Sequence, residues 1–153
     1  MDALDRKIVD HLLRDGRATF QEIGHAVGLS APAAKRRVDR MRERGEIAGF
    51  TALIDPAALG WDTSAYVELS YQGNVSADRL KRDLEAFPEV IGAWTITGDA
   101  DALVHVVASS MADLERVIEG IRAVDQVDRS RTIVVMSRLF ERPLHDGRGR
   151  AGD

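Results

Sequence analysis

No cysteine occurs anywhere in the 153-residue sequence. A chain without thiols forms no disulfide, offers no thiolate nucleophile and binds no metal through sulfur. This absence excludes three classes: disulfide-stapled folds, thiol-dependent enzymes and proteins with cysteine-ligated metals.

Long apolar runs are missing too. No stretch approaches the roughly 18 apolar residues that a membrane-spanning helix requires. The first ten residues, MDALDRKIVD, are charged and amphipathic, which is not the composition of a signal peptide. With 44% hydrophobic and 30% charged residues, the composition is that of a folded globular protein. We therefore expect a cytoplasmic protein with no membrane partner.

Familiar catalytic patterns are also absent. The sequence has no glycine-rich phosphate loop and no nucleophile elbow, and its histidines show no metal-ligand spacing. We predict no catalytic residue, no metal and no cofactor. His105 falls on a predicted strand among apolar residues, where we expect a core or interface histidine.

The most informative pattern lies in residues 16–50, which read as two short helices separated by a glycine turn. Thr19 and Glu22 have the spacing of a capping box, so a helix is predicted to begin directly after Thr19. Gly28 ends this helix, and Ser30 is a good N-cap for the next one. Together with an amphipathic helix over residues 2–14, this pattern predicts a helix-turn-helix unit.

The helix that follows Ser30 is strongly basic. Residues 30–44 hold six basic and two acidic side chains, a net charge of +4, whereas the residues after Gly60 carry −5. Ala34, Val38 and Met41 fall on one apolar stripe, and Arg36 and Arg40 point away from it. A local positive face on an acidic body is typical of an element that docks on DNA phosphates, although a solvated basic helix gives the same pattern. The residues predicted to contact DNA are Ser30, Ala33, Lys35, Arg36, Arg37, Arg40 and Arg44.

The second half of the chain has a strand-rich rhythm. The predicted elements are a strand at 64–71, a helix capped by Ser76, strands at 90–97 and 103–108, a helix over 111–121 and a strand at 130–139. Their order, βαββαβ, is that of a ferredoxin-like fold. The predicted domains are a helix-turn-helix domain at 1–50, a strand and linker at 51–63, a ferredoxin-like domain at 64–142 and a disordered tail at 143–153. The linker strand is expected to begin at Gly49 and to close at Pro56.

Both faces of the predicted sheet carry apolar residues. One parity of the strands gives Trp94, Ile96, Val104, Val106, Ile133 and Val135; the other gives Tyr66, Leu103, Val107, Val134 and Met136. In a βαββαβ fold both helices cover the same face, so the second face is left open to solvent in a monomer. An exposed apolar face of this kind usually marks an interface. We predict a homodimer through the sheet; a monomer with a half-buried sheet is the alternative.

With both halves placed, the chain resembles the Lrp/AsnC (feast/famine) transcription regulators over about residues 3–140. The first half carries Leu4-Asp5 with Ile8, Gly16-Arg17, Val27-Gly28-Leu29-Ser30, Arg37-Val38, Gly45-Glu46-Ile47 and the stretch AGFTALIDPAALG. The second half carries Thr97-Gly98-Asp99-Ala100-Asp101 and the run from Ser130 to Met136. Each marker alone is weak; in this order and spacing they are specific.

The resemblance implies an α+β protein with a winged helix-turn-helix domain followed by a ferredoxin-like ligand-sensing domain. The implied function is sequence-specific transcription regulation on double-stranded DNA, modulated by a small effector, typically an amino acid. It also implies dimers that assemble further into tetramers or octamers. By position, the family's effector site corresponds to Gly98, Asp99, Asp101, Ser130 and Thr132. An α-amino acid needs acceptors for its ammonium and donors for its carboxylate, which a carboxylate, loop amides and hydroxyls supply.

The chain departs from the family at Ala100 and Ala102, where relatives often have aromatic residues. This difference favours a roomier site and a larger effector side chain; a site that has lost its effector is the alternative. Asp101 has a second interpretation, as an aspartate that only stabilises the turn.

Two other functions remain open from the sequence. Sirohaem decarboxylases resemble the same two-domain fold, but typically carry an Arg-Arg-Ile-Gly-like run where this chain has Ala48-Gly49-Phe50-Thr51. An architectural DNA-binding protein without an effector is the other alternative.

Overall fold

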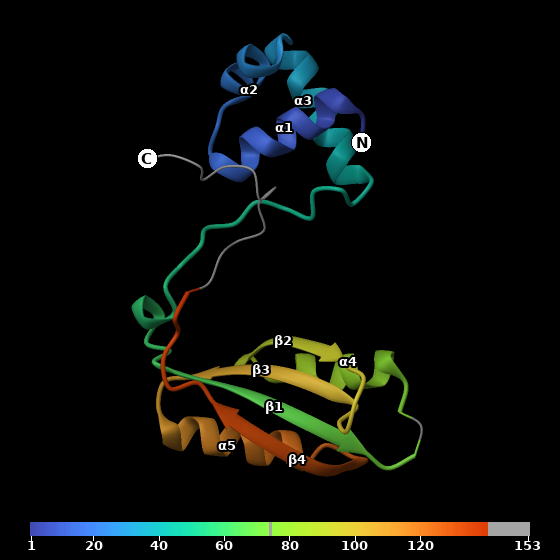
Figure 1. Ribbon diagram of the computed structural model, residues 1–153, viewed down its shortest axis with the longest axis vertical. Helices are drawn as coiled ribbons and strands as arrows, with labels where there is room; N and C mark the ends of the chain where they lie inside the picture. Colours follow the sequence, from blue (N-terminus) through green and yellow to red (C-terminus); the bar gives the residue numbers. More distant parts are fainter. Residues whose placement is uncertain (74, 141–153) are drawn as a thin grey trace. The chain divides into compact units, whose positions relative to one another are not determined.

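The computed structural model describes residues 1–73 and 75–140 (Figure 1). The chain forms two compact units, one containing Met1–Ala52 and the other Leu53–Leu139. The predicted disordered tail at 143–153 lies outside the described residues, as does the end of the domain predicted at 64–142.

Three helices form the first unit: α1 (Ala3–Arg14), α2 (Phe20–Val27) and α3 (Ala31–Glu43). The predicted start of α2 is confirmed. The Thr19 side chain accepts a hydrogen bond from the Glu22 N–H, and the Glu22 carboxylate accepts one from the Thr19 N–H at 2.7 Å. A second capping box, formed by Asp2 and Asp5, begins α1.

A small apolar core holds the three helices together. Its fully buried side chains come from all three: Ile8, Ile23, Ala34, Val38 and Met41. The apolar stripe predicted on α3 is therefore confirmed. Because that stripe faces inward, the basic side chains on the opposite side of α3, among them Arg36 and Arg40, are exposed to solvent.

A glycine inside α2 permits a close approach of the turn before α3. The Gly24 carbonyl accepts a hydrogen bond from the Leu29 N–H at 2.8 Å. A Cβ at Gly24 would lie 2.5 Å from the Leu29 carbonyl oxygen, and backbone cannot yield as a flexible side chain does. Gly28 ends α2 with φ 73°, in the left-handed region that favours glycine. The sequence indicated Gly28 but not Gly24, because a glycine within a helical pattern carries no turn signal.

Gly24→Ala is expected to destabilise the helix-turn-helix unit by ~1–3 kcal/mol, the usual cost of forcing an extra group into a packed site. Thermal unfolding followed by circular dichroism measures this change. Gly16→Ala is the matched control, since its nearest neighbour would be 3.8 Å away. Equal melting temperatures for Gly24→Ala and wild type would contradict the close approach.

The strand predicted between Gly49 and Pro56 is wrong. Residues 49–55 have no regular secondary structure, and the segment continues into a short 3₁₀ helix, η1 (Pro56–Leu59), which the sequence suggested only as a linker. A strand requires a hydrogen-bonding neighbour, and no described residue of the same chain pairs with this segment. Its apolar side chains are correspondingly exposed: Phe50 at 52%, Leu53 at 76% and Ile54 at 54%.

The second unit contains four strands and two helices: β1 (Thr63–Tyr71), α4 (Ala77–Glu85), β2 (Val90–Thr95), β3 (Ala102–Ala108), α5 (Met111–Arg122) and β4 (Val127–Val134). The strands form one antiparallel sheet in the order β2-β3-β1-β4, so β2 and β4 are its edges (Figure 1). The predicted βαββαβ arrangement and α+β class are confirmed. β4 begins and ends earlier than the predicted strand at 130–139.

The core of the second unit lies between α4, α5 and one face of the sheet. Ala65, Val67 and Leu69 from β1 and Val104 and Val106 from β3 are fully buried there. Opposing them are leucine, valine and isoleucine side chains of the two helices: Leu80, Leu84, Leu114, Val117, Ile118 and Ile121. The opposite face of the sheet carries no helix among the described residues, and we call it the open face.

The predicted assignment of side chains to the two faces is partly wrong. Trp94 pairs with Leu103 and Ile133 pairs with Tyr66, so all four lie on the open face. Val134 pairs with Ala65 and belongs to the helix-covered face, while Met136 lies beyond β4. Alternation along one strand shows which of its residues share a face of the sheet. Only the register with the neighbouring strands shows whether that face is the helix-covered face or the open face.

Candidate nucleic-acid interface and effector pocket

The basic side of α3 is available for an external partner. Arg36, Arg40 and Arg44 are exposed, and none makes an ion pair or a side-chain hydrogen bond with another described residue. Ser30 is exposed at the start of α3 and makes no side-chain capping hydrogen bond, so its hydroxyl is also available. Ala33 is half-buried. These side chains form a donor-rich surface along one helix, which suits the acceptors of phosphates and base edges.

Lys35 is partly engaged within the protein. Its ammonium lies 2.5 Å from a carboxylate oxygen of Asp39, one turn along α3, and 6.0 Å from the centre of the Phe20 ring. An exposed pair at this spacing contributes only ~0.3–0.5 kcal/mol. Lys35 therefore remains able to exchange Asp39 for a phosphate.

Arg37 has a structural role that the sequence did not reveal. Its guanidinium donates to the carboxylates of Asp2 at 2.6 Å and Asp5 at 2.7 Å, at the start of α1. Asp5 is only 5% exposed. The hydrogen bond from Arg37, the largest contribution, lowers the pKa of Asp2 to about 2. Burial raises the pKa of Asp5, but hydrogen bonds from Arg37 and the Asp2 N–H outweigh it and lower that pKa overall. Arg37 thus holds α3 against α1.

This ion-pair cluster predicts a specific dependence of stability on pH. Aspartates with lowered folded-state pKa values stabilise the protein above their unfolded pKa of roughly 3.9. That stabilisation is lost as the pH falls through the lowered pKa values, of which that of Asp2 is about 2. We expect Arg37→Gln to lower the melting temperature near neutral pH, and the difference from wild type to shrink between roughly pH 4 and pH 2. Arg36→Gln, on the exposed side of the same helix, is the control and should match wild type throughout. A difference that does not change with pH would rule out this assignment.

The loop between β2 and β3 is built around Asp101. One carboxylate oxygen of Asp101 accepts a hydrogen bond from the Tyr71 N–H at 2.8 Å. The Asp101 N–H donates to the Leu69 carbonyl at 2.9 Å, and its carbonyl accepts from the Ile96 N–H at 3.0 Å. Gly98 has φ 128°, a value that other residues rarely adopt. Asp101 therefore anchors the loop to β1, in line with its turn-stabilising interpretation.

Tyr71 and Asp101 also affect each other electrostatically. Burial, followed by the negative charge of Asp101, raises the pKa of Tyr71 to about 12. The tyrosine is therefore neutral near pH 7, and its hydroxyl is buried with no hydrogen-bond partner in the described part of the chain.

The two hydroxyl residues predicted for the effector site are directed to the helix side of β4. The Ser130 hydroxyl accepts a hydrogen bond from Arg122 Nε of α5 at 2.7 Å. Thr132 lines a different hollow, of about 250 Å³, between α5 and β4, and its buried hydroxyl has no partner among the described residues. The five predicted effector residues therefore do not converge within one chain.

A second hollow, of about 260 Å³, lies beside the loop and near the ends of β1 and β4. We call it the charged pocket; it is lined by Glu68, Ser70, Asp99, Ala100, Arg129, Ser130 and Arg131. The sequence predicted only Asp99 and Ser130 as binding residues here, with Ala100 as added space. Ala102 is fully buried in the core and makes no room in this pocket. Glu68 and Arg131 were missed because their proximity depends on the pairing of β1 with β4, where they are direct partners.

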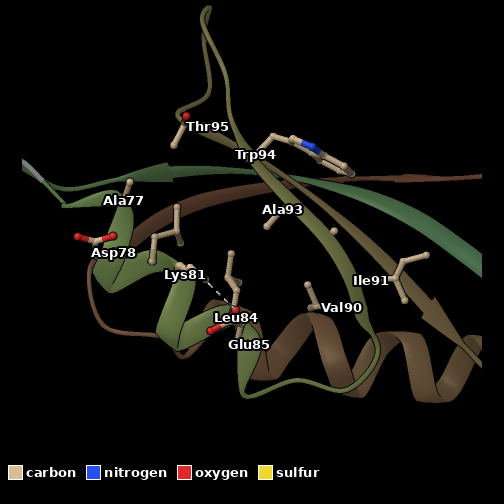
Figure 2. A pocket seen from close by; sticks show the side chains of 12 residues that line it. Ala77, Asp78, Lys81, Leu84, Glu85, Val90, Ile91, Ala93, Trp94 and Thr95 are labelled. Atoms are coloured by element: carbon tan, nitrogen blue, oxygen red, sulfur yellow. Dashed lines mark ion pairs between the residues drawn. The ribbon is translucent and has the colours of Figure 1, made fainter. Parts of the chain in front are cut away.

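A third hollow, of about 550 Å³, is a groove between α4 and the edge strand β2. Figure 2 shows Leu84 and Val90 on the helix side of β2 and the Trp94 side chain on the opposite side. Lys81 and Glu85 form an ion pair at its rim, 3.7 Å apart. None of the residues predicted for DNA or effector binding lines this groove.

Other classes of site find no support in residues 1–73 and 75–140. No group of three or more histidine, aspartate and glutamate side chains is arranged to hold a metal ion. No helix there has the length and apolarity to cross a membrane. His105 lies on the open face, stacked on Tyr66 with ring centres 4.5 Å apart, and its Nε2 is 2.9 Å from the Ser64 hydroxyl.

A helix-turn-helix unit with an outward basic helix, followed by a βαββαβ unit, defines a class of two-domain transcription regulators. Models of two domains match the chain: the AsnC-type helix-turn-helix domain over residues 1–42 and the Lrp/AsnC ligand binding domain over residues 64–144. The chain therefore belongs to the Lrp/AsnC family of transcriptional regulators.

Similar proteins agree with this membership. The HTH-type transcriptional regulator Rv2324 of Mycobacterium tuberculosis is 49% identical over 142 residues, covering 93% of this chain and 96% of its own. The leucine-responsive regulatory protein of Rhizobium meliloti is 36% identical, covering 91% of each. Among solved structures, the M. tuberculosis leucine response regulatory protein LrpA has a TM-score of 0.86 at 30% identity, covering 95% of this chain and 99% of that one. The feast or famine regulatory protein Rv3291c from M. tuberculosis, complexed with L-methionine, has a TM-score of 0.86 at 31% identity, covering 94% and 97%.

Proposed function

We propose that the protein is a sequence-specific DNA-binding transcription regulator of the cytoplasm, and that a small effector, an amino acid, changes its assembly or its DNA affinity. The observation that carries the DNA part is the basic face of α3. Its buried stripe fixes the helix in the unit, while Arg36, Arg40 and Arg44 have no side-chain partner among residues 1–73 and 75–140. A helix held in this way can present arginines to guanine edges and phosphates in a major groove.

We further propose that the protein acts as a homodimer joined through the open face. Tyr66, Trp94, Leu103 and Ile133 lie on that face, and Trp94 and Ile133 are 52% and 44% exposed. Large apolar side chains gathered on one face favour burial against a second copy. Two linked recognition helices also bind more tightly than one.

The amino-acid part of the proposal is supported by the ligand-binding domain and by the complex of the similar regulator Rv3291c with L-methionine. An effector shifts function only through a difference in its affinity for two states. A pocket near a subunit interface has a different affinity for the effector in the two assembly states, because assembly changes which residues line the pocket. Typical couplings of ~1–3 kcal/mol change affinity about 5- to 150-fold.

The proposal is tested by titrating wild-type protein onto DNA from upstream of its own gene, with and without each of the twenty amino acids. We expect saturable binding that exceeds binding to shuffled DNA, and a midpoint shift of about 5- to 150-fold with at least one amino acid. Equal binding to shuffled DNA would favour an architectural protein. No shift with any amino acid would leave a regulator without this effector class.

The named relatives are transcription regulators, which favours regulation over the sirohaem decarboxylase alternative. Incubation with sirohaem tests that alternative directly. An unchanged absorbance spectrum is the expected result, and spectral conversion of the sirohaem would establish an enzyme.

A further inference from the structure

We propose that the charged pocket binds the effector as a zwitterion, with Arg129 on its carboxylate and Asp99 on its ammonium, and that it selects an amino acid with a polar, uncharged side chain. This inference rests on the proposed amino-acid effector. It names the binding residues and the effector class, and it moves the ammonium site from Asp101 to Asp99.

Four side chains of the pocket are ionic, and two of them, Asp99 and Arg129, lack strong partners among the described residues. Asp99 is exposed and makes no ion pair or side-chain hydrogen bond with another described residue. The Arg129 side chain is 77% exposed, and the one ion pair that it makes among the described residues is a loose 3.9 Å approach of Nε to the carboxylate of neighbouring Asp128. Asp128 also accepts a hydrogen bond from Gln72 at 2.9 Å. The pocket thus contains an anion and a cation that do not pair with each other.

An α-amino acid complements this arrangement, because it carries the opposite pair of charges on one carbon. Its carboxylate accepts hydrogen bonds from a guanidinium, often two in parallel, and its ammonium donates to a carboxylate. Asp101 does not line the pocket, and one of its carboxylate oxygens already accepts from the Tyr71 N–H.

The remaining walls determine which side chain fits. None of the lining residues is leucine, isoleucine, valine, methionine or aromatic. Two contacts, at 2.7 and 3.0 Å, join the Glu68 carboxylate to the Arg131 guanidinium, and this pair presents both acceptors and donors. The Ser70 hydroxyl adds another donor and acceptor.

An apolar effector side chain would make no hydrogen bond to the Glu68–Arg131 pair. It would cover the Glu68–Arg131 pair without replacing the hydrogen bonds that water makes to it. A charged side chain would compete with one member of the pair. A polar, uncharged side chain can donate to Glu68 and accept from Arg131 while the pair stays intact.

Matched amino acids test the side-chain preference. Asparagine and leucine have nearly the same shape, and glutamine and methionine have similar length, so each pair differs mainly in polarity. Calorimetric titration of the full-length protein should give at least about tenfold tighter binding for the polar member of each pair, since a site built for hydrogen bonds rejects an apolar analogue. Tighter binding of leucine and methionine would overturn the polar preference and leave the amino-acid effector standing. Failure of all four to bind would overturn the inference, whereas the effector part of the proposed function fails only if none of the twenty amino acids shifts DNA binding.

A double-mutant cycle tests the role of Arg129. Arg129→Gln should weaken asparagine binding by about tenfold or more, and so should removal of the ligand carboxylate in 3-aminopropanamide. Once Arg129 has been replaced, removing the ligand carboxylate should weaken binding little further, and the same should hold when the two changes are made in the opposite order. The reason is that both changes remove the same contact. Arg82→Gln, an exposed cation of α4 outside the pocket, is the control and should bind as wild type does. Equal asparagine binding by Arg129→Gln and wild type, or additive losses in the cycle, would overturn the assignment of Arg129 to the carboxylate.

Discussion

Replacing Arg36 and Arg40 together by alanine is expected to abolish discrimination between operator DNA and shuffled DNA. Both side chains project from the solvent side of α3 and have no internal partner in the described part of the chain. A base-reading arginine contributes ~1–3 kcal/mol of discrimination, and each phosphate contact adds to the dependence of affinity on salt. The double substitution should therefore weaken operator binding and flatten its salt dependence. Gel-shift titrations at several salt concentrations measure both quantities.

Two controls separate recognition from folding. Arg6→Ala removes an exposed cation of α1 that makes no ion pair among residues 1–73 and 75–140, and it should leave operator discrimination intact. Arg37→Gln should lower the melting temperature through loss of its contacts with Asp2 and Asp5. Operator binding by the double variant at wild-type affinity and salt dependence would contradict the placement of α3 on DNA.

Replacing Ile133 by aspartate is expected to break the homodimer. Ile133 lies next to Tyr66 on the open face, so in the proposed dimer the new carboxylate would be buried without a partner. Light scattering should report a monomer where wild type gives a dimer. DNA affinity should fall by about 10²- to 10⁴-fold, the gain that linking two binding modules can provide.

The matched control, Met111→Asp, introduces the same charge in place of another exposed apolar residue. Met111 begins α5, on the helix side of the sheet, and is 58% exposed. Aspartate in the first turn of a helix is favourable, so Met111→Asp should remain dimeric. A wild-type protein that is monomeric at micromolar concentration, or an Ile133→Asp dimer as stable as wild type, would refute the open face as the interface.

Local chemistry made most of the fold predictable from the sequence. The capping box of Thr19 and Glu22, the glycine after α2 and the stripe of Ala34, Val38 and Met41 depend on residues within a few positions of one another. The order of strands and helices in the second unit follows from similar short-range patterns.

Features that depend on distant pairings were not predictable in the same way. Trp94 and Ile133 were placed on the wrong face because the register of β2 and β4 depends on hydrogen bonds to other strands. The predicted strand after Gly49 has suitable residues, but it has no pairing partner within the described chain. The contact of Arg37 with Asp5 joins residues 32 positions apart, and no spacing rule indicates it.

The effector site has some features that were predictable from the sequence and others that depend on distant pairings. The loop containing Gly98, Asp99 and Asp101 was identified in the sequence by family resemblance, and its backbone geometry explains the need for Gly98. The roles within it were not predictable, because Asp101 is held by the backbone of β1 and Arg129 lies on a strand from the far end of the chain. Only the folded sheet shows that Asp99 and Arg129 line the same pocket.

The central claim is that α3 lies in the DNA major groove, and site-directed cleavage tests it most directly. Because the chain has no cysteine, Ser30→Cys provides a single attachment point for an iron–EDTA reagent at the start of α3. Glu115→Cys, on the exposed side of α5, provides the control. The account predicts strand cleavage from position 30 at sites within each operator half-site, offset as expected for a major-groove reagent, and none from position 115. Cleavage from position 115 alone, or equal cleavage from both positions, would contradict it.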